Sequence, residues 1–233
     1  MKKFLKYSVL TVCAVIFCIA AVFTVKGYAM YRRALNDNPP ELAVEKIQSN
    51  ENYVSIDVLP KLYLDSVLAV EDRRFYYHPG VDPISIARAV FNDIRRMKLV
   101  EGGSTITQQF AKNTFFTQER KLERKVAEAL MALRLERMYS KKEILELYVN
   151  TIYFGSGYYS IREASRGYYD KEPWELSDYE CTMLAGLPNA PSVYSLDNNP
   201  ELAAQRQQQV VNKLVKYGYI KKKEGERILS GAH

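Results

Sequence analysis

The feature that most constrains this chain is an uncharged apolar run near its start. Residues 7–25 contain no Asp, Glu, Lys or Arg and are rich in Val, Ile, Phe and Ala. As a helix, a run of this length covers most of a hydrocarbon layer about 30 Å thick. A cleaved signal peptide would have a shorter apolar segment and a small-residue cleavage site. We therefore expect an uncleaved transmembrane signal anchor, with residues 1–6, which carry Lys2, Lys3 and Lys6, in the cytoplasm.

The rest of the chain has room for one good-sized domain. We expect residues 26–50 to act as a linker, since Asn36-Asp37-Asn38-Pro39-Pro40 marks a break. The domain is expected over residues 51–220, followed by a basic C-terminal tail over residues 221–233. With a cytoplasmic N-terminus, a single-pass anchor places this domain at the outer face of the cell membrane.

The net charge of +6 is a poor guide to the domain. Residues 1–33 hold six Lys or Arg residues and no acid, which leaves 27 basic and 27 acidic residues in the rest. A nucleic-acid-binding domain would be more basic, so no nucleic-acid partner is expected. Of three cysteines, only Cys181 lies outside the apolar run, which excludes a disulfide within the domain and a metal cluster built on thiols.

Hydrophobic residues recur at helical spacing along most of the domain. Leu122, Val126, Ala129, Leu130 and Leu133 form the clearest run. Helices are expected from about residue 59, with Pro60 in the first turn, and over residues 84–98, 120–138, 141–152, 160–168, 176–186 and 200–216. Alternation typical of strands is scarce, so the sequence predicts a mainly α fold.

Two acids, Glu71 and Glu128, lie in unusually specific tracts. Glu71 begins Glu71-Asp72-Arg73-Arg74-Phe75-Tyr76-Tyr77-His78-Pro79-Gly80 and lies near the end of its helix. Glu128 shares one helical face with Lys121, Arg124 and Lys125, at spacings of three or four residues. Taken singly, each feature is ordinary: a helix-terminal surface acid in one case, a solvated salt-bridged face in the other.

A glycine-rich polar loop between the two acids changes this balance. Gly102-Gly103-Ser104-Thr105 offers backbone N–H groups and hydroxyls without side-chain bulk, which suits phosphate oxygens. The same region has a local excess of positive charge, with ten basic and five acidic residues over 95–137. The loop lacks the Lys-Ser or Lys-Thr ending of a P-loop. Two acids around a cationic loop indicate transfer chemistry on a phosphate-activated substrate.

Histidine chemistry is limited, because the chain contains only His78 and His233. This count excludes a site built from several histidines. For His78, which precedes a Pro-Gly turn, a structural hydrogen-bonding role is favoured over acid or base catalysis. Several tyrosines could line a sugar groove, although packing explains most of them: Tyr148, Tyr153, Tyr158 and Tyr159.

The motifs together resemble those of the peptidoglycan glycosyltransferase family, found in bifunctional penicillin-binding proteins and in monofunctional membrane transglycosylases. Five blocks carry the resemblance, in the family's order: Glu71-Asp72-x-x-Phe75-x-x-His78-x-Gly80; Gly102-Gly103-Ser104-Thr105-Ile106-Thr107-Gln108-Gln109 with Lys112-Asn113; Arg124-Lys125-x-x-Glu128; Ile144-Leu145-Glu146-Leu147-Tyr148-x-Asn150-x-Ile152-Tyr153-Phe154-Gly155; and Leu184-Ala185-Gly186-Leu187-Pro188-Asn189-Ala190-Pro191-Ser192. They cover residues from about 50 to 220 and are jointly highly specific.

The resemblance implies a lysozyme-like, mainly α domain with a larger lobe and a smaller, membrane-proximal lobe. It implies that the substrates are lipid II, an undecaprenyl-pyrophosphoryl disaccharide-pentapeptide, and the growing glycan strand. The reaction joins disaccharides through β-1,4 bonds with inversion and releases undecaprenyl pyrophosphate, in bacterial cell-wall synthesis. Other cell-wall synthesis proteins are expected as partners.

The resemblance also implies roles for individual residues. Glu71 is the implied general base for the acceptor's 4-hydroxyl, and Glu128 assists on the donor side, near the pyrophosphate and any bound Mg²⁺ or Mn²⁺. No organic cofactor is implied. The residues expected to hold the phosphates are Lys112, Arg120, Arg124 and Lys125, and those expected to shape the cleft are Ser104, Gln109 and Tyr153. Inversion by direct displacement needs such a base but no glycosyl-enzyme.

The chain departs from the family's pattern in three places. Ser160 stands where glycine is usual, Ser165 where alanine is usual, and Tyr168-Tyr169-Asp170-Lys171 replaces the commoner Tyr-Phe-Gly-Lys. These changes bear on cleft shape and efficiency more than on reaction type. The chain shows no Ser-x-x-Lys or Lys-Thr/Ser-Gly tract, so we expect a monofunctional enzyme without a transpeptidase domain.

Two other functions stay open. A lysozyme-like glycan hydrolase also uses two carboxylates, but it has no need of phosphate-binding cations. An inactive membrane scaffold of the cell-wall machinery would be expected to lose the acids, and both are present.

Overall fold

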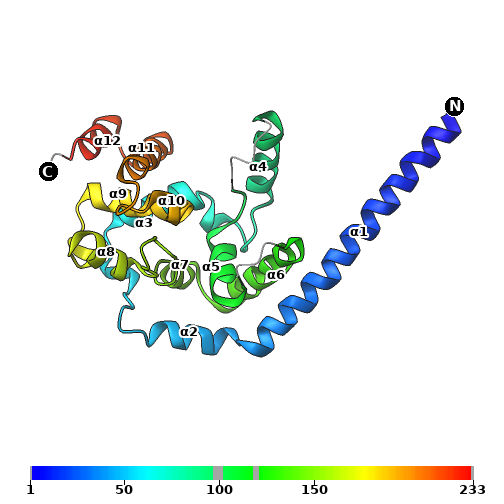
Figure 1. Cartoon of the computed structure of the whole chain (residues 1–233), viewed down its shortest axis with the longest axis horizontal. Helices are drawn as coiled ribbons and strands as arrows, with labels where there is room; N and C mark the ends of the chain where they lie inside the picture. Colours follow the sequence, from blue (N-terminus) through cyan, green and yellow to red (C-terminus); the bar gives the residue numbers. More distant parts are fainter. Residues whose placement is uncertain (1, 97–101, 118–120, 232–233) are drawn as a thin grey trace.

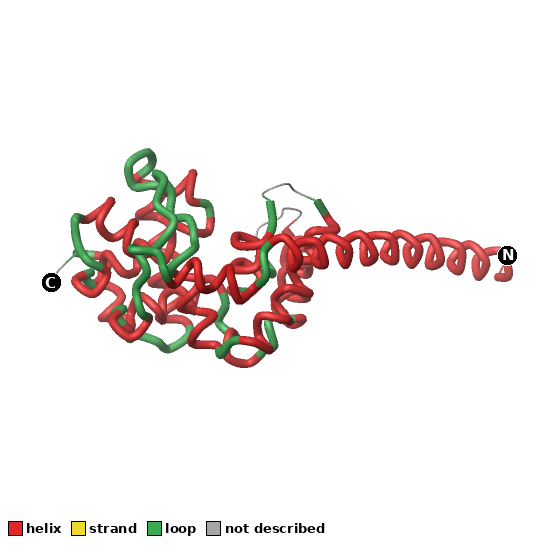
Figure 2. The backbone as a smooth tube through the Cα atoms, turned by 90° about the horizontal axis from the view of Figure 1, so that it is seen from below, coloured by secondary structure: helices red, strands yellow, loops and turns green. Residues whose placement is uncertain are grey.

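The computed structural model describes residues 2–96, 102–117 and 121–231, which are mostly helices joined by short loops. The α-helices are α1 (Lys2–Asp37), α2 (Pro40–Gln48), α3 (Lys61–Glu71), α4 (Pro83–Arg96), α5 (Ile106–Phe115), α6 (Leu122–Met138), α7 (Lys141–Val149), α8 (Ile161–Tyr169), α9 (Asp178–Gly186), α10 (Pro191–Tyr194), α11 (Pro200–Lys216) and α12 (Lys222–Leu229). Short 3₁₀ helices lie at Ile56–Val58, Phe75–Tyr77, Pro173–Glu175 and Leu187–Asn189. Figure 2 shows no strand in the described ranges, so the mainly α prediction is confirmed.

The helix α1 leaves the body of the molecule and projects alone (Figure 1). The apolar part of α1 is exposed in the structure: the exposed fraction is 74% for Phe17 and 68% for Val25. Such a continuous apolar surface is unfavourable in water. By length and composition the helix is able to cross a membrane, so it fits the predicted anchor.

The stretch expected as a linker, residues 26–50, is mostly helical rather than open. α1 continues to Asp37, at the predicted break, and α2 begins at Pro40. Ala43 and Val44 of α2 are buried in the hydrophobic core, because apolar residues in this stretch pack on the domain. The predicted C-terminal tail likewise contains α12, whose Ile228 is buried. The division into anchor, linker, domain and tail stays a prediction.

Two groups of helices form the body. In one, α3, α9 and α11 pack against one another, and α12 packs on α11. In the other, α5 packs between α6 and α7, and α6 also lies along α1. The seven predicted helices appear as α3, α4, α6, α7, α8, α9 and α11, whereas α2, α5, α10 and α12 were not predicted.

Candidate active site

A polar cleft of about 650 Å³ lies where the two helix groups meet. Its lining residues come from α3, α4, α5, α6 and α11 and from the loop before α5. The lining includes Glu71, Ser104, Gln109, Lys112, Lys125, Glu128, Arg206, Gln209, Lys213 and Lys216. The fold therefore brings the two acids predicted as catalytic into one cleft, together with several cations.

Glu71, the last residue of α3, has one carboxylate oxygen that accepts a hydrogen bond and one that has none. Its side chain is 7% exposed, and the amide of Gln109 donates to Oε2 at 2.7 Å. Oε1 is buried without a hydrogen-bond partner among the described residues, and Arg206 Nη2 lies 3.8 Å from it. A buried polar atom left unpaired costs free energy, so such atoms point to function. This geometry suits a base that awaits a proton donor.

The residues that follow Glu71 fix the end of α3 to the start of α5. His78 Nδ1 accepts the N–H of Gly80 at 3.2 Å, so the ring proton lies on Nε2, 2.9 Å from Asp72 Oδ2. Asp72 Oδ2 also accepts the N–H of Ile106 at 3.1 Å. Both ring nitrogens of His78 are thus occupied, which agrees with the structural role predicted for this histidine.

The glycine-rich tract leads into α5, a helix that the sequence analysis did not predict. Thr105 Oγ1 accepts the N–H of Gln108, and the Gln108 side chain accepts the N–H of Thr105, each at 3.1 Å. Because Ile106 donates to Asp72, the amides of Thr105, Ile106 and Gln108 are already bonded. The amide of Thr105 is therefore not available to a phosphate, whereas phosphate binding by the amides of Gly102, Gly103 and Ser104 stays a prediction.

Glu128 of α6 is fully buried between two cations. Lys125 Nζ donates to Oε2 at 2.7 Å, and Arg124 Nε lies 3.2 Å from Oε1. Lys125 Nζ also lies 3.2 Å from Ser104 Oγ, which ties α6 to the loop before α5. The charged face of α6 is therefore only partly solvated: Arg124 and Glu128 are buried, whereas Lys125 is exposed and lines the cleft together with Glu128.

Lys112 of α5 lines the cleft with its ammonium free of hydrogen bonds and ion pairs to other described residues. Burial is the main reason that the pKa of Lys112 lies below its ordinary value. Glu128 opposes this shift, whereas Lys125 and Arg124 add to it. A partly buried, unpaired ammonium is well placed to bind an anion.

Other predicted site residues are not all in the cleft. Arg124 lies behind Glu128 and does not line the cleft, and Tyr153 stacks on Tyr159 outside it, with ring centroids 4.6 Å apart. Arg120 lies outside the described residues. Within the described ranges no group of three metal-ligating side chains occurs. A single Glu128 paired with two cations does not fit a resident Mg²⁺ or Mn²⁺.

The sequence analysis missed the wall that α11 contributes to the cleft. Arg206, Gln209, Lys213 and Lys216 all line it. Their spacings of three, four and three residues place them on one helical face, and this stripe was a readable signal. Lys213 Nζ donates to the carbonyl of Val70 at 3.1 Å, next to Glu71 in the chain.

The structure thus has a helical domain with two acids and several cations in one cleft, carried on an apolar helix. The profile of the family described as Transglycosylase matches residues 41–215. The chain therefore belongs to the transglycosylase family, as its motifs indicated.

Two relatives found by sequence agree with this assignment. Penicillin-binding protein 1A of Aquifex aeolicus is 47% identical over 76% of this chain and 24% of its own length. A protein of Cupriavidus necator named as a candidate transglycosylase is 39% identical over 82% of this chain and 83% of its own length. The crystal structure of penicillin-binding protein 1A from Haemophilus influenzae aligns with 76% of this chain and 17% of that chain, at 21% identity and a TM-score of 0.46. The chain spans about a quarter of the length of the first penicillin-binding proteins it matches.

Proposed function

We propose that this protein polymerises lipid II into β-1,4-linked glycan strands, with inversion and release of undecaprenyl pyrophosphate. The observation that carries the proposal is a carboxylate oxygen of Glu71 that has no hydrogen bond to a described residue, in the same cleft as Lys112, Lys125 and Glu128. A base for the attacking hydroxyl and cations for the leaving group are the two requirements of such a displacement.

In this proposal Glu71 is the general base. Oε1 takes the proton of the acceptor's 4-hydroxyl as that oxygen attacks the donor sugar, and Gln109 holds Oε2 so that Oε1 is the oxygen presented. A positioned base contributes about 10²–10⁴-fold to the rate. No glycosyl-enzyme forms, and the burial of Glu128 between Arg124 and Lys125 supports a role other than nucleophile.

The leaving pyrophosphate meets side chains on the α5 and α6 side of the cleft. Lys112 and Lys125 neutralise the charge that develops there, and Ser104 can donate a hydrogen bond. Arg124 and Glu128 hold Lys125 in place. The stripe on α11 adds cations on the Glu71 side, where the second lipid-linked substrate would lie. Arg120 and Tyr153 keep their predicted roles as proposals.

The packing of α6 on α1 supports a position of the cleft at the height of a membrane surface. A Cβ placed on Gly27 would lie 2.5 Å from Val126 Cβ, and Tyr31 and Leu130 line one pocket, so the two helices run in the same direction. Glu128 thus lies near the level of residue 29, about 6 Å beyond the apolar run. This height suits a sugar carried on a lipid pyrophosphate, and the basic residues before the run favour an outer-face domain.

The test is a polymerisation assay with the full-length protein and lipid II in detergent, analysed on gels. The wild type should give long glycan strands, and Glu71→Gln should abolish them. The matched control is Glu201→Gln, an exposed acid on α11, which should keep wild-type activity.

Other results would count against the proposal. Short soluble fragments from preformed glycan would favour a hydrolase, and no turnover by folded wild-type protein would favour a scaffold. Full activity of Glu71→Gln would exclude Glu71 as the base. Dependence on Mg²⁺ or Mn²⁺ stays a prediction, tested by running the assay with and without EDTA.

A further inference from the structure

The α11 end of the cleft carries two cations whose side chains converge on one aromatic ring. The guanidinium carbon of Arg73, two residues after Glu71, lies 4.6 Å from the centre of the Tyr217 ring. The ammonium of Lys216, the last residue of α11, lies 5.8 Å from the same centre. All of these residues line the cleft. Both distances allow cation–π attraction, so the ring keeps the two charges in neighbouring positions.

Neither of these cations has an anionic partner in the part of the chain that the structure describes. Arg73 and Lys216 are exposed and form no hydrogen bond or ion pair with another described residue. Among the described acids that line the cleft, Asp72 and Glu128 already accept hydrogen bonds from neighbouring groups. Two converging cations attract an oxyanion, and a planar guanidinium matches both oxygens of a carboxylate.

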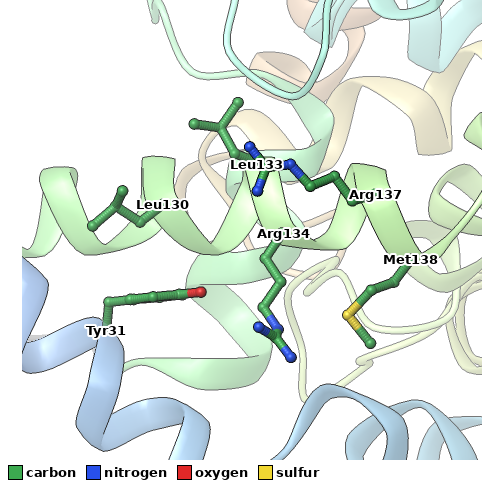
Figure 3. Close-up of a pocket in the computed structure, with 6 residues that line it drawn as sticks. All are labelled: Tyr31, Leu130, Leu133, Arg134, Arg137 and Met138. Carbon is green, nitrogen blue, oxygen red and sulfur yellow. The ribbon is translucent and has the colours of Figure 1, made fainter.

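The hollow between α1 and α6 lacks this convergence. Its volume is about 310 Å³, and its charged groups belong to Arg134 and Arg137. Figure 3 shows the two guanidinium groups on different sides of α6. Two cations that point apart do not form one site for an anion, so the α11 end of the cleft is the better place to look for a bound oxyanion.

The distance of the two cations from Glu71 indicates which oxyanion reaches them. Arg206 Nη2 lies 3.8 Å from Glu71 Oε1, beside the predicted base. Lys216 is ten residues further along the same helix, which is about 15 Å at about 1.5 Å per residue. An extended peptide of five residues spans about 17 Å. A pentapeptide joined to a sugar at Glu71 is therefore long enough to bring its carboxyl end to Arg73 and Lys216.

We propose that Arg73, Lys216 and Tyr217, together called the α11 corner, bind the C-terminal carboxylate of the pentapeptide of lipid II. This inference rests on the proposed function, which supplies the substrate, and it gives the α11 corner a part in substrate selection that is separate from the chemistry at Glu71. Arg73 and Lys216 pair with the carboxylate, while the Tyr217 ring holds both cations in place. Lipid II with a free peptide carboxylate therefore binds more tightly than lipid II whose peptide ends in an amide.

The test uses two forms of lipid II that differ only in this terminal group, a carboxylate or a carboxamide. Full-length Glu71→Gln protein, which should not consume the substrate, is titrated with each form in detergent by calorimetry. The carboxylate form should bind about fivefold more tightly, since an exposed ion pair contributes about two- to fivefold. Adding Arg73→Gln with Lys216→Gln should remove this difference. Adding Arg73→Glu with Lys216→Glu instead should make the amide form the tighter ligand.

The matched control adds Lys221→Gln with Lys223→Gln to the same protein. It removes the same charge from exposed residues that do not line the cleft, so it should keep the preference for the carboxylate form. Equal affinity for the two forms before the α11 corner is changed would overturn the proposal. If the loss of Arg73 and Lys216 then weakened both forms equally, these cations would bind the lipid pyrophosphate instead. A preference that survives Arg73→Gln with Lys216→Gln would also overturn the proposal.

Polymerisation by the wild type separates this inference from the proposed function. If the wild type makes glycan strands but the two forms bind equally, only the role of the α11 corner is wrong. If the carboxylate form binds more tightly but no strands form, the proposed function is wrong and the α11 corner still binds the peptide. A lack of binding by either form would overturn both. Thermal unfolding midpoints confirm that each variant is folded.

Discussion

Asp170 occupies a backbone position that glycine would fill at lower cost. It ends α8 with φ of 54° and ψ of 38°, in the left-handed region, and it stands where the family commonly has glycine. We predict that Asp170→Gly raises the free energy of unfolding by about 0.5 kcal/mol, because a side chain is disfavoured in this region. For a domain of this size the melting temperature should rise by about 1–2 °C in calorimetry.

Ser160 provides the control, because its replacement by glycine should change the melting temperature in the opposite direction. Its φ is −147°, and its hydroxyl accepts the N–H of Glu163 as the N-cap of α8. Ser160→Gly relieves no strain and removes this cap, so it should lower the melting temperature slightly. A gain from Ser160→Gly together with a loss from Asp170→Gly would contradict the argument. The third departure, Ser165, is accommodated because its buried hydroxyl donates to the carbonyl of Lys171 at 2.7 Å.

Lys112 should show a conflict between stability and activity. Its pKa is lowered mainly by burial, so between that pKa and the ordinary 10.5 the folded protein binds fewer protons than the unfolded chain. Stability therefore rises with pH across this window, and the buried charge is unfavourable below it. We predict that Lys112→Met keeps or raises the melting temperature at pH 7 and loses polymerisation by about 10- to 100-fold. The variant should also lack the rise in stability between the lowered pKa of Lys112 and 10.5.

The control for Lys112 is Lys142→Met, an exposed lysine of α7 that pairs with Asp57. It should leave polymerisation unchanged, and its pKa is raised by Asp57, so it cannot produce the same pH trend. A melting temperature for Lys112→Met well below the wild-type value would contradict the burial argument. Calorimetry over pH 6–11, beside the gel assay, measures both effects.

Single residues of the site were predictable where their chemistry lies in a local motif. Glu71, Glu128, Ser104, Gln109, Lys112 and Lys125 all line the cleft as the motifs suggested. Tyr153, which the abundance of tyrosines and then the resemblance suggested for the cleft, lies outside the lining. The lack of a hydrogen bond at Glu71 Oε1 could not be predicted from the sequence, because it depends on how α3, α5 and α11 pack together.

Among the helices, α5 shows what periodicity alone overlooks. Its ten residues mix polar and apolar side chains, and the preceding glycines suggest a loop. The signal that was available is the capping box, Thr105 followed by Gln108 three residues later. α6 shows the reverse: its period was plain and its charged face was assigned to the site, but the partner of its apolar face could not be predicted. That face docks on α1, which is a fact of tertiary packing.

The start of α5 should control both stability and activity, because this helix carries Gln109 and Lys112. Thr105 Oγ1 accepts the N–H of Gln108 and donates to the carbonyl of Gly80 at 2.6 Å. We predict that Thr105→Val lowers the free energy of unfolding by about 1–2 kcal/mol and also lowers polymerisation. Urea unfolding and the gel assay measure the two effects.

Ser177 is the matched control for this prediction, since it forms the same capping box at the start of α9. Ser177 and its partner Glu180 do not line the cleft. Ser177→Ala should lower stability by a similar amount, about 1 kcal/mol, while polymerisation per folded molecule stays at the wild-type level. If both variants lost activity in proportion to stability alone, the start of α5 would have no particular part in placing the site.

On the scale of the whole molecule, the contact between α1 and α6 links the apolar helix to the candidate active-site cleft. α1 packs closely on α6, and the six residues from Leu122 to Ala127 lead directly to Glu128. The height of the cleft above the membrane therefore depends on how closely these two helices approach. The anchor was predictable from composition, but this second role for its C-terminal half was not, because nothing local distinguishes residues 26–37 from a linker.

Gly27 sets the approach of the two helices. A side chain there would begin 2.5 Å from Val126 Cβ and 2.7 Å from the carbonyl oxygen of Glu123, both too close for real contacts. Small residues at such crossings allow helices to pack tightly. We predict that Gly27→Leu separates α1 from α6, so that polymerisation of lipid II in vesicles falls about tenfold while the domain keeps its helical circular dichroism.

Ala29→Leu is the matched control, since it adds the same side chain to an exposed site on α1 and should keep activity. Both variants keep the apolar run, so both should bind vesicles equally in flotation. If Gly27→Leu alone then loses polymerisation, the loss is due to the weakened contact between α1 and α6. Equal activity of the two variants would show that the cleft finds its height without this contact.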